Sequence, residues 1–371
     1  MATLTRASNQ WATRPKDERY DSLEGLHLAA QGYRERARKA LVATRDLHPV
    51  VLEDGKVGLN GKTGINAPVT HWAFGQLARI SDAPADYLRS LPAPLAVECL
   101  QEGITSPKSG HDDQTMVLFD QPDAQTLTAH DSRSPATIRA LTSTKYTRIF
   151  NSDVTARLVR LNQERPEWQP APAALDGSRG LYMGDRDMFA FLVDNNRRVF
   201  EKDENGGFSR GFFVWNSEVG AEAFGLMTFL YEYVCGNHIV WGAKAIRELR
   251  LRHVGNVDER AAQAFDATIT AYDETSASTE ETMIRTARGF RIAESKDDVL
   301  DKVFGLRVPV LTRKALEASY TVADQFSDWY GDPRTAWGLA NGITQFSQSK
   351  AYANQRVELD RAAGRVLDMA F

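Results

Sequence analysis

Apolar side chains are most densely spaced along residues 209–242, which read SRGFFVWNSEVGAEAFGLMTFLYEYVCGNHIVWG. Between residues 210 and 215 they alternate between two faces, with Phe212 and Val214 on one and Phe213 and Trp215 on the other. A strand that is apolar on both faces belongs inside a sheet, covered on each side. We therefore expect this strand at the centre of the fold.

The following residues, 221–234, have helical spacing. A stripe at i, i+4, i+7 and i+11 is formed by Ala223, Met227, Leu230 and Val234. Asn216 or Ser217 can cap such a helix, because a short side-chain oxygen accepts the free N–H groups of a first turn. Gly236 can end it, and residues 238–241 resemble a short returning strand. The pattern predicts a strand, a buried helix and a strand in succession.

Before this unit, helical spacing alternates with hairpin patterns. Helices are predicted at residues 26–47, 71–80, 83–91 and 94–104, and two more within 132–164. Hairpins are predicted at residues 50–59, at 115–120 with 126–130, and at 181–193, where Gly184 and Asp185 interrupt the apolar run.

After the central unit, amphipathic helices are predicted at residues 311–330, 335–349 and 351–369. Gly338 and Gly342 lie four residues apart, which permits a close approach of another helix, from this chain or from a second copy. We predict the α+β class: a mostly antiparallel sheet with a long buried helix, N-terminal helices and a C-terminal helical tail. The predicted organisation is a flexible arm (1–25), an α+β core (26–310) and a tail (311–371) packed on the core or on a neighbouring subunit.

Composition narrows the class of protein. With 42% hydrophobic and 25% charged residues, the chain of 371 residues has the composition of a globular protein. No apolar run approaches the roughly 20 residues that span a bilayer, so we expect no membrane association and a cytosolic location in the host. The net charge of −4 provides no general attraction to nucleic acid, so binding of that kind would need a local basic patch.

Two segments have such a local excess of basic residues, 132–164 and 244–253. In the first, Tyr146 and Phe150 are interleaved with the cations, which is the chemistry of single-strand binding: cations for phosphates and aromatic faces for bases. The alternative is that the arginines cover the solvated sides of helices and the aromatic rings lie in the core. The candidate nucleic-acid contacts are Arg139, Lys145, Tyr146, Arg148, Arg210, Lys244, Arg247 and Arg250.

A second candidate cluster lies in the loop and hairpin between residues 111 and 131. Its carboxylates and imidazoles are of the kind that two-metal nucleases use, and its central members are Asp112, Asp113 and His130. Aspartate and histidine are also common loop residues, and closeness in sequence does not bring them together in space. The residues therefore favour a solvated loop, and the sequence assigns no catalytic residue, metal ligand or cofactor.

Five stretches resemble a phage- and plasmid-related protein family that carries a domain of unknown function. They are FGQLARISDAPADYLRSLP (74–92), RALTSTKYTRIFN (139–151), VWNSEVG (214–220), CGNHIVWG (235–242) and TAWGLANGIT (335–344). The resemblance implies a gene of a phage, plasmid or integrated element, and it carries no catalytic residue. A weaker, architectural resemblance is to phage single-strand annealing proteins of the RecT and Red beta kind.

The sequence leaves three hypotheses open. The first is a non-enzymatic DNA-binding protein that binds or anneals single strands during replication or recombination. The second is an interaction or assembly protein that acts on a host protein, and a homo-oligomer through the C-terminal helices is compatible with either. The third is a metal-dependent nuclease that uses the region of Asp112, Asp113 and His130.

Overall fold

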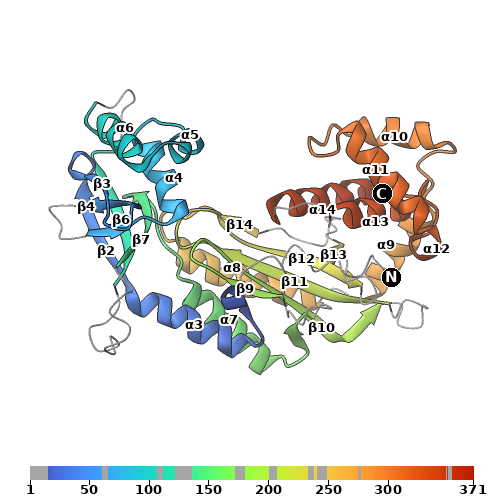
Figure 1. The fold of residues 1–371 in the computed structure, drawn as a ribbon. Coiled ribbons are helices and arrows are strands. Elements are labelled where there is room, and N and C mark those ends of the chain that lie inside the picture. The colour runs from blue at the N-terminus through green and yellow to red at the C-terminus, as the bar shows by residue number, and fades with distance from the viewer. Residues whose placement is uncertain are drawn as a thin grey trace.

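The structure is a computed structural model, and it describes residues 16–60, 66–106, 112–121, 136–171, 180–199, 207–232, 238–239, 249–274, 277–347, 349 and 353–371. Helices and antiparallel sheets are combined in it, with helices at the C-terminal end, which confirms the predicted α+β class. The N-terminal unit and the C-terminal helices lie at opposite ends of the largest sheet (Figure 1).

The N-terminal unit is built on two small sheets. One has the order β2 (Ala37–Ala43), β6 (Gln114–Asp120), β7 (Thr137–Ser143), and the other joins β3 (Pro49–Val51), β4 (Val57–Asn60) and β5 (Asn66–Pro68). Helices α4 (His71–Ile80), α5 (Ala85–Ser90) and α6 (Ala93–Thr105) supply much of the core, through buried residues such as Leu77, Leu88 and Leu100. The predicted helices at 71–80, 83–91 and 94–104 and the hairpin at 50–59 are confirmed.

Two helix predictions in this part of the chain were too long. Helix α3 (Leu23–Arg36) ends where β2 begins, so the predicted helix 26–47 is half strand. Residues 132–164 contain β7 and one helix, α7 (Asn151–Glu164), instead of two helices. In both cases the strand pairs with β6, a contact that the local spacing of apolar residues does not report.

Part of the expected N-terminal arm has defined structure. A 3-10 helix, η1 (Lys16–Glu18), precedes β1 (Arg19–Tyr20), which pairs with β9 (Leu181–Met183), and α3 begins at Leu23. The Ser22 Oγ accepts a hydrogen bond from the Gly25 N–H, so this residue is the N-cap of α3. The rest of the predicted arm, residues 1–15, lies outside the described part of the chain.

The large sheet has the order β1-β9-β10-β11-β12-β13, with β8 (Trp168–Pro170) also pairing with β10 and β14 (Leu249–Leu251) with β12. Strand β11 (Phe208–Asn216) lies between β10 (Met188–Val199) and β12 (Phe224–Glu232). Phe212 and Val214 face one apolar core, and Phe213 and Trp215 face another. The central strand predicted at 210–215 and the hairpin at 181–193 are therefore confirmed.

The buried helix predicted at residues 221–234 is wrong, because β12 occupies most of this range and pairs with β11 along its length. Phe224 and Leu226 face one side of the sheet, and Met227 and Phe229 face the other. An uninterrupted apolar run fits both periods, so spacing alone could not separate them. A Cβ on Gly225 would lie 2.0 Å from the Trp215 ring, so the strand pairing at this point requires glycine.

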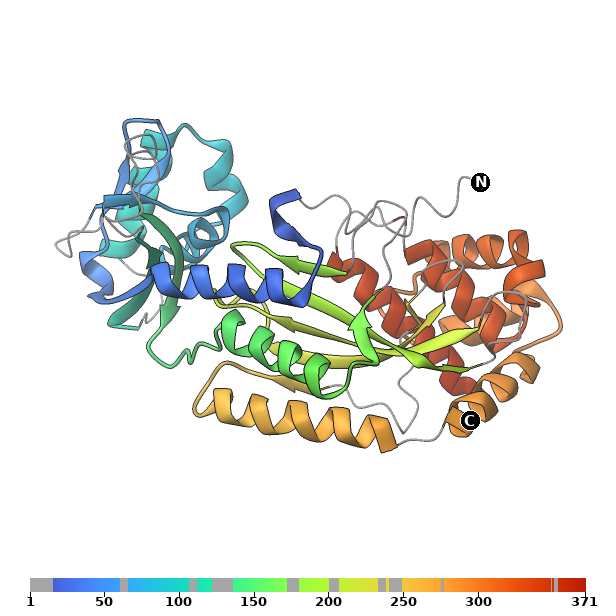
Figure 2. The ribbon, with the colours of Figure 1, turned by 90° about the horizontal axis from the view of Figure 1, so that it is seen from below.

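Three helices cover one face of this sheet: α3, α7 and α8 (Val257–Glu274), which run along it in Figure 2. Their apolar sides share a core with the strands, for example Leu26 of α3, Leu158 of α7 and Phe265 of α8. The predicted returning strand is present as β13 (His238–Ile239), and residues 240 and 241 lie outside the described part of the chain.

The C-terminal helices form a core of their own. They are α9 (Ala277–Gly289), α10 (Lys296–Phe304), α11 (Arg313–Gln325), α12 (Ser327–Tyr330), α13 (Ala336–Ser347) and α14 (Ala353–Leu367), followed by η3 (Asp368–Ala370). This core consists of buried residues from Ile284 onward together with Phe208 of β11. The Phe208 ring packs edge-on against Trp337, with 5.4 Å between the ring centroids. The predicted helices at 311–330, 335–349 and 351–369 are confirmed.

The close approach expected at Gly342 occurs within the chain. A Cβ on this residue would lie 2.4 Å from the backbone oxygen of Ser319 and 2.6 Å from the Cβ of Ala323, both on α11. The glycine thus serves the packing of α13 on α11. Among the described helices, none has the length and apolar character needed to cross a membrane.

Candidate nucleic-acid interface

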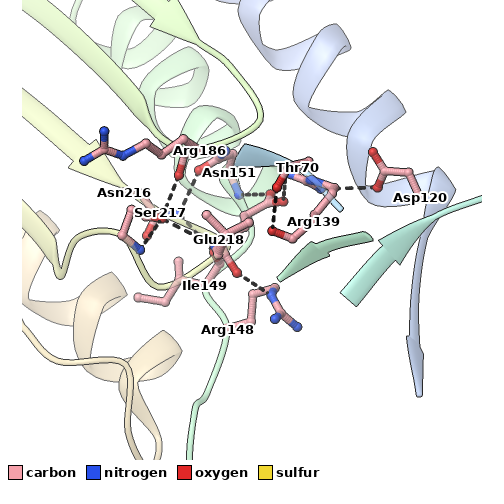
Figure 3. A network of polar contacts seen from close by, with 12 residues as sticks. Thr70, Asp120, Arg139, Arg148, Ile149, Asn151, Arg186, Asn216, Ser217 and Glu218 are labelled. Carbon is pink, nitrogen blue, oxygen red and sulfur yellow. Dashed lines mark hydrogen bonds and ion pairs between the residues drawn. The ribbon is translucent and has the colours of Figure 1, made fainter. Parts of the chain in front are cut away.

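A buried polar network joins the N-terminal unit to the large sheet, and Glu218 is at its centre (Figure 3). The Glu218 carboxylate accepts a hydrogen bond from the Asn151 N–H at 2.8 Å and lies 3.1 Å from Nη2 of Arg139. Its backbone oxygen accepts a hydrogen bond from Nε of Arg148 at 2.6 Å. Arg139, Arg148 and Glu218 are only 2%, 8% and 1% exposed. Arg139 therefore pairs with a buried carboxylate and Arg148 with the backbone of the same residue, and neither arginine lies on the surface.

The network extends in both directions from Glu218. Arg139, on β7, reaches the Asp120 carboxylate of β6 at 3.4 Å, and burial raises the pKa of Asp120 while Arg139 opposes the increase. Asn216 donates from Nδ2 to the backbone oxygen of Ile149 at 2.9 Å and to the side-chain oxygen of Asn151 at 2.7 Å. These contacts thus join segments that are distant along the chain. Such a network fixes the orientation of the two units.

Three stretches that carry the family resemblance meet here. Gln76, from the 74–92 stretch, donates to the Val219 oxygen at 2.8 Å and accepts from the Leu141 N–H at 2.9 Å. It therefore bridges the 214–220 and 139–151 stretches. These three stretches therefore form the contact between the N-terminal unit and the large sheet.

Tyr146 also lies inside this junction. Its hydroxyl donates to the Ser217 oxygen at 2.7 Å, and its ring stacks on His253 at 4.9 Å between centroids. Burial raises the pKa of Tyr146, and it lowers the pKa of His253 to about 4. His253 is therefore neutral at pH 7 and cannot act as a cation for phosphate.

Arg210 lies in a second buried cluster, away from the others. Its Nε lies 2.9 Å from the Glu280 carboxylate of α9. Its Nη2 donates a hydrogen bond to the backbone oxygen of Tyr272, and its guanidinium lies 4.1 Å from the centroid of the Tyr272 ring. Arg210 is fully buried, and burial raises the pKa of Glu280 to about 6. This arginine attaches α8 and α9 to the central strand, and it cannot reach a phosphate in this conformation.

The remaining predicted contacts are scattered. Lys145 is exposed in the turn after β7, and Arg250, half exposed on β14, lies 3.7 Å from Glu222. Lys244 and Arg247 lie outside the described residues. The prediction therefore does not give one continuous surface: Arg139, Tyr146 and Arg148 come together inside the protein, and Arg210 and Arg250 lie elsewhere.

The structure does bring other cations to an aromatic ring. The Arg34 guanidinium lies 4.6 Å and the Lys39 ammonium 5.2 Å from the centroid of Phe150, which is half-buried. We call Arg34, Lys39 and Phe150 the cationic–aromatic patch. Arg34 is paired with Asp153, whereas Lys39, which is exposed, has no carboxylate within ion-pair distance in the described part of the chain.

Positive charge is concentrated at this patch. Partial burial lowers the pKa of Lys39, and the neighbouring charges of Arg148 and Arg34 lower it further. The Nη2 atom of Arg148 is buried without a hydrogen-bond partner among the described contacts. An anion beside Lys39 would therefore relieve repulsion among like charges. Phe150 is distant from Arg34 and Lys39 along the chain. The tertiary structure brings the three side chains together.

The region proposed for a metal site has no such arrangement. Asp112 and Asp113 are exposed, and His130 lies outside the described residues. Within the described ranges, no group of at least three histidine, cysteine, aspartate or glutamate side chains could hold a metal ion.

Comparison with protein-family models gives a match over residues 140–365 to the family described as "Domain of unknown function (DUF932)". This range includes Arg148, Phe150 and Glu218, and it ends within α14. The chain belongs to the DUF932 family. No curated protein and no solved structure matches it.

The DUF932 match divides the candidate surface in two. Phe150 and Arg148 lie within the matched residues, whereas Arg34 and Lys39 belong to the N-terminal part of the chain that precedes them. The resemblance noted in the sequence to a family with a domain of unknown function is confirmed. The DUF932 description itself specifies no activity.

Proposed function

We propose that the chain binds single-stranded DNA through the cationic–aromatic patch. The observation that supports this proposal is the Phe150 ring with Arg34 and Lys39 within about 5 Å of its centroid, where Lys39 has no carboxylate partner in the described part of the chain. An aromatic face stacks on a base, and the adjacent cations neutralise the phosphate that follows it. The overall charge of −4 limits the attraction to this patch.

The resemblance to phage- and plasmid-related proteins gives this proposal its biological setting. Binding or annealing of single strands during replication or recombination of such an element, in the bacterial cytoplasm, is the role that we propose. The strands β9 to β12 followed by the long helix α8 are compatible with the architectural analogy to single-strand annealing proteins. The analogy concerns architecture only and assigns no residue.

The direct test is fluorescence anisotropy with a labelled single-stranded oligonucleotide and its duplex, each at low and moderate salt. We expect a preference for the single strand and an affinity that falls steeply with salt, because each neutralised phosphate releases counterions. Phe150→Ala should weaken single-strand binding roughly 5- to 150-fold, since stacking on an aromatic ring contributes about 1–3 kcal/mol per base.

Matched controls come from the C-terminal helices. Phe304→Ala removes a ring that is 51% exposed on α10, and Lys314→Gln removes an exposed charge on α11; neither should change the affinity. Equal losses from Phe150→Ala and Phe304→Ala, or no binding of either nucleic acid at low salt, would contradict the proposal. The hypothesis to test next would then be that the chain binds a protein partner.

A further inference from the structure

A polar cavity of about 390 Å³ lies at the end of the N-terminal sheet where β2 ends, β6 begins and β7 ends. Helix α4 forms one wall through Gln76 and Arg79, and the turn after β11 closes another through Gly220. Gly220 has φ +79°, and a Cβ there would lie 3.4 Å from the Tyr146 ring and 3.8 Å from Thr142. Both distances are ordinary van der Waals contacts, so the positive φ, and not a close approach, favours glycine in this turn.

The lining offers groups for a nucleobase and a phosphate. The Thr142 hydroxyl is buried and has no hydrogen-bond partner among the described contacts, and Tyr146 lines the same cavity. Gln114, at the rim, carries an amide that can both donate and accept. Arg79 is an exposed cation that lines the same cavity, as does the exposed Asp112, and the described contacts include no ion pair between the two. The Thr142 hydroxyl and the Gln114 amide can form hydrogen bonds with the edge of a base, and the Arg79 guanidinium can pair with an anion.

The cavity lies next to the cationic–aromatic patch. Tyr146 lines it, the Arg148 guanidinium lies 5.5 Å from the Tyr146 ring, and Arg148 in turn repels the charge of Lys39. From Tyr146 to Phe150 the chain can extend over at most about 14 Å. On the sheet, Lys39 is level with Leu118 and Ala140, and Thr142 is one side-chain row further along the same face.

We infer that this cavity holds one base of the single strand whose neighbouring nucleotide lies on the cationic–aromatic patch. The inference rests on the proposed function and adds a base-reading site to it. Stacking on Phe150 accepts any base, whereas hydrogen bonds from Thr142 and Gln114 discriminate among base edges. The patch therefore supplies affinity, and the cavity supplies a preference at one position.

The test is an abasic scan, with an oligonucleotide of about ten nucleotides, which exceeds the smallest single-strand sites of about four. One nucleotide at a time is replaced by an abasic residue, and the affinity is measured for the wild-type chain, Thr142→Val and Phe150→Ala. We expect two sensitive positions in the wild-type chain. Sensitivity at one, roughly 2- to 10-fold, should vanish in Thr142→Val, and sensitivity at the other should vanish in Phe150→Ala.

Gln114→Leu at the rim provides a second variant if Thr142→Val fails to fold. If Thr142→Val and Gln114→Leu both keep every sensitive position of the wild-type chain, the cavity holds no base and the inference fails, while DNA binding through the patch stands. If the wild-type chain binds no oligonucleotide at low salt, the proposed function fails, and this inference fails with it.

Discussion

Arg148 and Phe150 are two residues apart, yet they belong to regions of opposite character. Around Glu218, arginine side chains are buried, and they are held by a carboxylate and backbone oxygens. Around Phe150, Arg34 and Lys39 are exposed, and Lys39 has no acidic partner in the described structure. The same type of residue therefore stabilises the fold in one region and remains available to a ligand in the other. Local charge density does not distinguish these two roles.

Disruption of the buried network around Glu218 should have the largest effect on the free energy of unfolding. Glu218→Ala leaves Arg139 inside the protein with only the Asp120 carboxylate, and removal of one partner of a buried pair costs about 3–5 kcal/mol. The free energy of unfolding, measured by chemical denaturation, should fall by that amount.

Asp153→Ala is the matched control in the exposed region. Asp153 pairs with Arg34 on the surface, with side chains 53% and 46% exposed, so its loss should change the free energy of unfolding by at most about 1 kcal/mol. If the two variants were equally stable, the buried network would contribute no more than a surface pair, and the contrast between the regions would be lost.

The buried pair of Arg210 and Glu280 should make stability depend on pH. Burial raises the pKa of Glu280 in the folded protein to about 6 from its ordinary 4.5, so the folded state binds the proton more tightly than the unfolded state does. The contribution of Glu280 is therefore fully present below about pH 4.5 and is lost as the pH rises through about 6. This amounts to something on the order of 2 kcal/mol.

Stability against pH, compared between the wild-type chain and Glu280→Gln, measures this contribution. The variant should lack the part of the pH dependence between about 4.5 and 6 that the wild-type chain shows, because glutamine does not titrate. Parallel curves for the two chains over that interval would show that the Arg210 charge already holds Glu280 ionised.

The smallest effect on stability is expected at the patch. Lys39→Gln should leave the free energy of unfolding within about 0.5 kcal/mol of the wild-type value, because Lys39 is exposed and pairs with no carboxylate in the described structure. The same variant should reduce the slope of log affinity against log salt for single-stranded DNA by about 0.7, the loss of one phosphate contact. A large loss of stability with an unchanged salt slope would assign Lys39 to the structural region.

Secondary structure could be predicted where the spacing of the apolar side chains fitted one period better than the other. Residues 71–80, 313–325 and 336–347 form helices as their spacing indicated, and the two-faced strand at 210–215 was recognisable from its alternation. Strand β12 was mistaken for a helix because both of its faces are buried, and its continuous apolar run satisfied the helical period as well. β2 was missed because its pairing with β6 is not encoded in its own spacing.

The candidate site could be predicted only in its residue types. Cations interleaved with Tyr146 and Phe150 do surround the interface, but Arg139 and Arg148 turn inward to Glu218, which is 70 residues from Arg148 along the chain. The cations that lie against Phe150 are Arg34 and Lys39, which belong to neither of the two segments with a predicted excess of basic residues. The packing of α3 against α7 brings Arg34 to Phe150, and Lys39 follows on β2, directly after α3.

The sequence alone determined the α+β class, most of the helices and the central strand, because hydrophobic periodicity acts between residues close along the chain. The tertiary structure alone decided which basic side chains are buried and which face solvent. The free energy of a charged side chain depends on carboxylates, carbonyl oxygens and solvent that distant segments bring to it. Arg148 is therefore held inside the protein, whereas Lys39 is exposed to solvent.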